Sequence, residues 1–257
     1  MNTNALVKLH AISSQLDALE GVWRADQLAQ SHQAYVPSGH CELDPELPGQ
    51  GWPLGQMTEI LQTQSGQHEW RLLLPALRQA VTQGPLVLVG APQVPNLPAL
   101  ALLGIPAKQV LRVDAHSTAE RLWTSEQVLR CRELGALMTW LPQARPEQLR
   151  RLQLASTATQ ALVFAFRPVA VRYESSPAPL RLALRATPGD VLGMDHSLSV
   201  ELIKRRGPAM DHPIQLAAPL PVMAALRKRR LLKEPGHAVG RPASSHLQQH
   251  HLQPVAA

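Results

Sequence analysis

The chain has 257 residues, enough to bury one good-sized hydrophobic core, and carries a formal charge of +6. It contains no apolar run of about 18 residues and does not open on a charged segment followed by an apolar one, so we expect neither a membrane span nor a secretion signal. Its two cysteines, Cys41 and Cys131, lie far apart without metal-ligand spacing. We therefore expect a protein of the reducing cytoplasm in which both cysteines are small packing residues.

The first segment, residues 1–34, predicts a helical arm with a linker. Leucine and isoleucine recur at helical spacing over residues 5–20, and Leu9 and Leu16 lie on this apolar face. Trp23 and Arg24 follow, an aromatic–arginine pair of the kind that anchors interfaces. We expect these four residues to bind a partner; the alternative for Trp23 is burial against the protein's own core.

The next segment, residues 35–216, predicts a single α/β core. Apolar strands are expected at 56–61, 86–89, 110–113, 136–141 and 161–166, and helices at 70–81, 97–103, 118–133 and 146–159. Continuous apolar strands that alternate with helices indicate a mostly parallel sheet covered on both faces. Period-two alternation at 180–185 and 198–204 instead predicts antiparallel strands that form a meander at the end of the sheet.

The polar turn between the first strand and helix of this core predicts a degenerate phosphate loop. A working loop reads G-x-x-x-x-G-K-[ST], and its lysine and hydroxyl reach the outer phosphates and magnesium. Ser65 and Gly66 here precede Gln67 and His68, which stand where that lysine and hydroxyl are required. We therefore expect no nucleotide cofactor at this turn.

The last segment, residues 217–257, is rich in proline, histidine and glutamine and predicts a tail without stable structure. It carries the densest basic run of the chain, which could contact a DNA backbone or an acidic surface, or serve only solubility. This run consists of Arg227, Lys228, Arg229 and Arg230. His246, His250 and His251 have no fixed scaffold, so we expect no metal site.

Several strings in the core resemble the RecA recombinase core over about residues 35–216. Residues 38–44 look like a turn of that family, 47–55 like its glycine-rich approach, and 56–60 like the strand before its phosphate loop. Within that superfamily, "LPGQGWPLGQMTEIL", "RLLLPAL", "LWTSEQVLR", "LRRLQLA", "SSPAPLRLAL" and "ELIKRRG" resemble a narrower group, the mutasome proteins called ImuA, which are encoded with translesion polymerases. The resemblance implies a RecA-like fold.

The resemblance also identifies what this chain lacks. Residues 89–95 offer no carboxylate to orient a water, and Trp140 stands at or near the place of a magnesium-linked aspartate. Losing these groups together with the phosphate-loop lysine should abolish hydrolysis, so we expect no enzyme. The DNA-facing loops of the recombinase correspond here to short links at 142–146 and 167–177, where arginines could still meet phosphate or form a solvated face. These candidates are Arg150, Arg151, Arg167 and Arg172.

The function that the resemblance implies is a non-catalytic accessory role in an SOS-induced translesion synthesis complex. The implied partners are a Y-family-like protein, ImuB, possible contact with RecA, and indirectly an error-prone C-family polymerase; direct DNA contact would be weak. The alternative is a cell-division inhibitor of the SulA type, which also resembles RecA without a phosphate loop. A weak ATPase with an unorthodox loop is a third interpretation, because the strand–turn–helix framework is retained.

Overall fold

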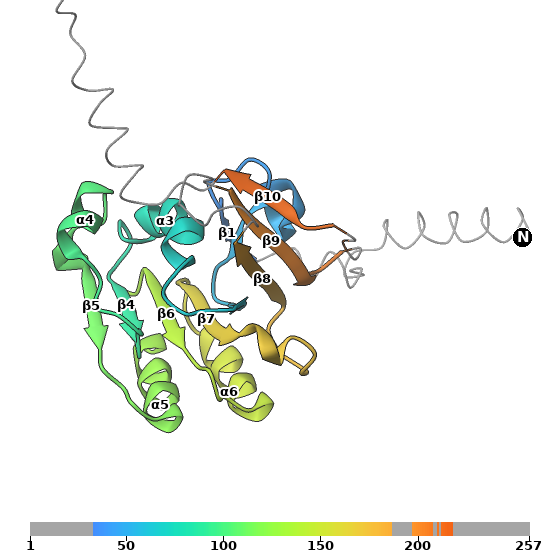
Figure 1. Ribbon diagram of the computed structural model, residues 1–257. Helices are drawn as coiled ribbons and strands as arrows, with labels where there is room; N and C mark the ends of the chain where they lie inside the picture. The colour runs from blue at the N-terminus through green and yellow to red at the C-terminus, as the bar shows by residue number, and fades with distance from the viewer. Residues whose placement is uncertain (1–32, 187–196, 208–209, 211, 218–257) are drawn as a thin grey trace, which may run out of the picture.

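The computed structural model describes residues 33–186, 197–207, 210 and 212–217 (Figure 1). The expected N-terminal arm, with Leu9, Leu16, Trp23 and Arg24, lies outside the described residues, as does the basic run at 227–230. The account below concerns the core between them. No helix of the described residues is long and apolar enough to cross a membrane.

The core is built on an eight-stranded sheet in the order β10-β9-β8-β3-β7-β6-β4-β5. The six strands from β8 to β5 run parallel, and β9 runs antiparallel to both of its neighbours. The strands are β3 (Met57–Gln62), β4 (Leu86–Val89), β5 (Val110–Val113), β6 (Ala136–Trp140), β7 (Leu162–Pro168), β8 (Leu180–Ala186), β9 (Ser197–Lys204) and β10 (Ile214–Ala217). The predicted α/β class and the antiparallel meander at the end of the sheet are confirmed.

Helices cover the two faces of the sheet separately (Figure 1). On one face α3 (Glu69–Ala80) and α4 (Leu97–Leu102) share a core cluster with every second residue of the strands. On the other, α5 (Thr118–Leu129) and α6 (Pro146–Ser156) pack over a second cluster around Met57 and Val163. Buried strands with apolar side chains on both faces explain the unbroken apolar runs of the sequence.

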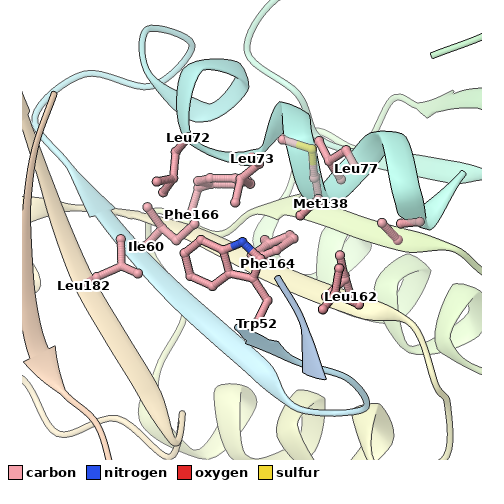
Figure 2. Close-up of a cluster of buried hydrophobic side chains, with 14 of the residues drawn as sticks. Trp52, Ile60, Leu72, Leu73, Leu77, Met138, Leu162, Phe164, Phe166 and Leu182 are labelled. Atoms are coloured by element: carbon pink, nitrogen blue, oxygen red, sulfur yellow. The ribbon is translucent and has the colours of Figure 1, made fainter. Parts of the chain in front are cut away.

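The first cluster lies between α3 and the face of β3 that carries Ile60 (Figure 2). Leu72, Leu73 and Leu77 of α3 are fully buried together with Ile60 and Phe164. The helix contains Pro75 and continues through it, so the proline neither begins nor ends α3. Trp52 belongs to the same cluster, and its ring packs edge to face against that of Phe164 with centroids 5.5 Å apart.

Trp52 belongs to a small ribbon that precedes the main sheet. The ribbon pairs β1 (Tyr35–Val36) with β2 (Trp52–Pro53) in antiparallel register. The remaining short elements are 3-10 helices: η1 (Asp44–Glu46), η2 (Pro48–Gln50), η3 (Ala107–Gln109) and η4 (Val169–Val171).

Two predictions differ from the structure, the burial of the cysteines and the end of one helix. Cys41 and Cys131 are both exposed free thiols, because Cys41 lies in a surface turn and Cys131 lies just after the end of α5. Trp123 of α5 is 64% exposed, because the helix buries Leu122, Ser125 and Leu129 on its other side. The helix predicted over 118–133 ends at Leu129, before a turn that leads into β6.

Candidate functional site

The turn after β3 is organised by Glu69, the first residue of α3. The side chain is 1% exposed and accepts four hydrogen bonds. Oε1 accepts from Gln62 Nε2 at 2.7 Å, from the Gly66 amide at 2.6 Å and from Trp140 Nε1 at 3.0 Å. Oε2 accepts from the His68 amide at 3.1 Å. A carboxylate offers acceptors only, and the four donors that it meets here come from three parts of the chain.

Glu69 therefore occupies the position where an anion would meet the turn. Backbone amides at the start of a helix favour negative charge, because of their unsatisfied donors and the helix dipole. Here the amides of Gly66 and His68 point to a carboxylate of the chain itself. Gly66 has φ of +91°, which glycine adopts at little cost, and this lets the turn close around the carboxylate.

The turn residues predicted to form the degenerate phosphate loop differ in exposure and in hydrogen bonding. Ser65 and Gln67 are exposed, and the Gln67 amide donates to Gln64 Oε1 at 2.8 Å. His68 is the residue that precedes α3, and its role here is the main-chain bond to Glu69. That these residues form a degenerate phosphate loop stays a prediction.

Trp140 closes the site from the neighbouring strands. It ends β6, is 5% exposed, and stacks on Phe166 of β7 with centroids 4.8 Å apart. Its indole N–H spans the sheet edge to reach Glu69. The position at which the resemblance implies a magnesium-linked aspartate thus holds a buried aromatic ring with a neutral donor.

Two clefts open at this same edge, where the carboxyl ends of the parallel strands meet. The first, of about 320 Å³, lies over the ends of β4 to β7. The second, of about 240 Å³, lies between the turn after β3 and the loop 91–96. Ala91, Pro92 and Trp140 line both clefts, so the two are contiguous.

Charged residues line the first cleft. Arg112 and Asp114 form an ion pair of 2.6 Å, and Arg121 lies beside them. The backbone amides of His116 and Ser117 hold the pKa of the Glu120 carboxyl below its usual range, as part of a capping box on α5. The carboxylate of Glu120 thus serves as a local cap of the helix.

Arg167, expected to be free for DNA, is a buried structural residue. Its side chain is 2% exposed; Nη1 pairs with Glu59 Oε1 at 3.1 Å and Nη2 with Glu174 at 3.1 Å. Glu59 is fully buried and also accepts from Arg181 at 2.8 Å. Arg167 is therefore removed from the candidate phosphate contacts, because its charge is already paired inside the protein.

The other candidate arginines in the described core lie on separate elements. Arg150 and Arg151 are exposed on α6, and Arg151 pairs with Glu126 of α5 at 2.9 Å. Arg172 follows η4 and forms a two-pronged pair with Glu201 of β9. No hydrogen bond or ion pair of the described residues joins the α6 arginines to Arg172. Within these residues no three histidine, cysteine or carboxylate side chains cluster in a way that could hold a metal ion.

Sequence reasoning missed Glu69, although the sequence carried a signal for it. An acidic residue at the first position of a helix, directly after a polar turn, favours capping of the turn amides. The partner Trp140 lies 71 residues away in the chain, so the full site required the sheet. The fold and site together define an α/β protein with a mostly parallel sheet and a carboxylate-filled turn.

Comparison of the sequence with models of known protein families finds no match. A search among curated proteins finds no relative either.

Proposed function

We propose that this chain is a non-catalytic, RecA-like accessory protein that acts through protein contacts in an SOS-induced translesion synthesis complex, as the resemblance to ImuA implies. The observation that carries the proposal is the Glu69 carboxylate, which fills the turn after β3. A carboxylate of the chain in this turn stabilises the turn and occupies the amides that would otherwise bind a phosphate.

The sheet supports the RecA-like part of the proposal. Six parallel strands with helices on both faces, and three last strands in a meander, are compatible with that fold. The strand–turn–helix unit of β3 and α3 lies at the centre of the sheet, since β3 pairs with both β7 and β8. This is where a nucleotide-binding relative would need its phosphate loop.

Electrostatics supports the absence of phosphoryl transfer. That reaction depends on cations placed around the transferring group, and each lost stabilising group costs about 3 kcal/mol or more. The turn here presents Glu69, and a second negative charge brought to the same amides would be repelled by it. Trp140 at the end of β6 offers a neutral indole where the resemblance implies a metal ligand.

The partners belong to the same proposal. They are an ImuB-like Y-family protein, RecA in a possible direct contact, and an error-prone C-family polymerase through them. Residues 1–34 and 217–257 are the proposed contact segments, in a cytoplasmic setting. A weak direct contact with DNA would use Arg150, Arg151, Arg172 and the run at 227–230.

A genetic complementation experiment tests the proposal. Removing the gene should lower the frequency of damage-induced mutation, and the full chain should restore it while a chain lacking residues 1–34 and 217–257 should not. Overproduction should leave cell length normal. Unchanged mutation frequency together with blocked septation would reject the accessory role and select a division inhibitor.

A further inference from the structure

Arg121 places a positive charge in the first cleft without an acidic partner among the residues that the structure describes. The side chain is half-buried in the first turns of α5. Its Nε donates to the Ala115 carbonyl at 2.9 Å and Nη1 to the Trp140 carbonyl at 3.0 Å. A guanidinium has five N–H donors, so these two carbonyls leave the charge uncompensated and donors to spare.

The local backbone is shaped around this arginine. Gly90 directly follows β4 and has a φ of +65°. A Cβ at this position would lie 2.5 Å from Arg121 Nε. Only glycine leaves this space while adopting that conformation readily. With both carbonyl bonds made, the guanidinium is held in one orientation, and a pre-organised group loses little entropy when a ligand binds.

The lining of the clefts suits a ligand that has one negative charge next to an apolar group. Arg167 also lines the cleft, but its charge is paired with Glu59 and Glu174, so Arg121 is the cation left for a ligand. The stacked rings of Trp140 and Phe166 and three prolines supply apolar surface. The contiguous second cleft is lined mainly by apolar groups, including Leu88 and Val94.

We propose that these clefts bind an extended segment of a partner protein, with an acidic side chain on Arg121 and an apolar neighbour in the second cleft. The inference rests on the proposed function, since it names the chemistry of one partner contact. Nucleic acid fits less well. Asp114 in the first cleft and Glu69 in the second would repel a chain of phosphates, whereas a single carboxylate can approach Arg121 alone.

The test uses the full chain labelled with 5-fluorotryptophan and followed by fluorine NMR. The probe is acetyl-Leu-Asp-Leu-amide at millimolar concentration, and its matched control is acetyl-Leu-Asn-Leu-amide. We expect the Trp140 resonance, assigned with a Trp140→Phe variant, to shift saturably with the acidic peptide. The asparagine peptide should bind about tenfold more weakly or worse, because a hydrogen-bonded charge is lost. The exposed Trp123 resonance should not move.

Three variants locate the effect. Arg121→Met should weaken the acidic peptide by about tenfold or more, whereas Arg130→Met, at the exposed end of the same helix, should leave binding unchanged. Asp114→Asn removes the cleft's own carboxylate from Arg112 and should tighten binding by about twofold to fivefold. A gain of affinity cannot arise from misfolding.

Several results would overturn the inference. Equal binding of the two peptides, or an unchanged shift in Arg121→Met, would show that Arg121 does not recognise the carboxylate. A Trp140 shift with a short oligothymidylate and none with the acidic peptide would assign the cleft to nucleic acid. If the peptide fails while partner capture by the full chain persists, the cleft inference is wrong and the proposed function stands.

Discussion

Glu69 joins four donors from β3, the following turn and β6 through one buried carboxylate. Replacing it by alanine leaves the donors of Gln62, Gly66, His68 and Trp140 facing a void, and a buried group without its partner costs about 1–3 kcal/mol. We expect Glu69→Ala to lower the free energy of unfolding by about 3 kcal/mol, measured by urea denaturation.

The matched control for this variant is Glu133→Ala. Glu133 is exposed in the turn before β6, so its loss should change the free energy of unfolding by less than about 0.5 kcal/mol. Equal stability of the two variants would show that the carboxylate does not hold the turn.

The two arginines Arg167 and Arg151, both candidates for DNA contact from the sequence, should behave differently when changed to methionine. Arg167→Met leaves Glu59 buried with Arg181 as its remaining cation partner, and breaking a buried pair on one side costs about 3 kcal/mol or more. Arg151 is 70% exposed, and losing its surface pair should cost less than about 1 kcal/mol. Thermal or urea unfolding of both variants compares them; a larger loss for Arg151 would contradict the assignment.

Single residues were the part of the protein least accessible from sequence. The role of Arg167 depends on Glu59, which lies 108 residues earlier and meets it only because β3 and β7 are neighbours. Trp140 was correctly placed at a strand end, yet its bond to Glu69 could not be inferred from either local pattern. Such contacts are decided by strand order, which periodicity does not encode.

At the scale of elements, the link between η4 and β9 gives a pH-dependent prediction. The Arg172 guanidinium, through its hydrogen bonds, holds the pKa of Glu201 below its usual range. The folded-state pKa is thus lower than the unfolded value of about 4.3, so the stabilisation is complete above that pH and is lost as the pH falls through the folded pKa.

Glu201→Gln should therefore be less stable than the wild type by at most about 1 kcal/mol at neutral pH, because the pair is partly exposed. The difference should shrink toward zero at an acid pH below the folded-state pKa of Glu201, where the wild-type carboxyl becomes protonated as well. Urea unfolding at both pH values measures it. A difference that stayed constant across this range would exclude the ion pair as its source.

Most elements followed from hydrophobic periodicity. The five strands β3 to β7 and four helices were predicted because buried strands have apolar runs and helices have apolar stripes. β8 was predicted as antiparallel from its alternating pattern, but it runs parallel to β3 and antiparallel only to β9. β10 was missed, because four residues with two exposed positions give too short a pattern. The edge strand β5 was predicted to be covered on both faces, because Val110–Val113 is apolar apart from one arginine, but its residues are exposed or half-buried.

The molecule as a whole combines two clefts at one edge of the sheet with a turn that its own carboxylate fills. Charge and composition limited the classes of protein to which the chain could belong. The alternation of apolar strands and helices along the sequence indicated the α/β architecture. Those data could not reveal that the edge has two contiguous clefts, the charged one lined in part by Arg121. We propose that this edge recognises another protein.

The most direct test of the proposed function is capture of purified ImuB and RecA by the purified full chain, with and without ATP and single-stranded DNA. The account predicts capture of at least one of these proteins, to the same extent with and without nucleotide. Capture that required ATP would contradict the carboxylate-filled turn, and capture of neither protein under any condition would contradict the accessory role.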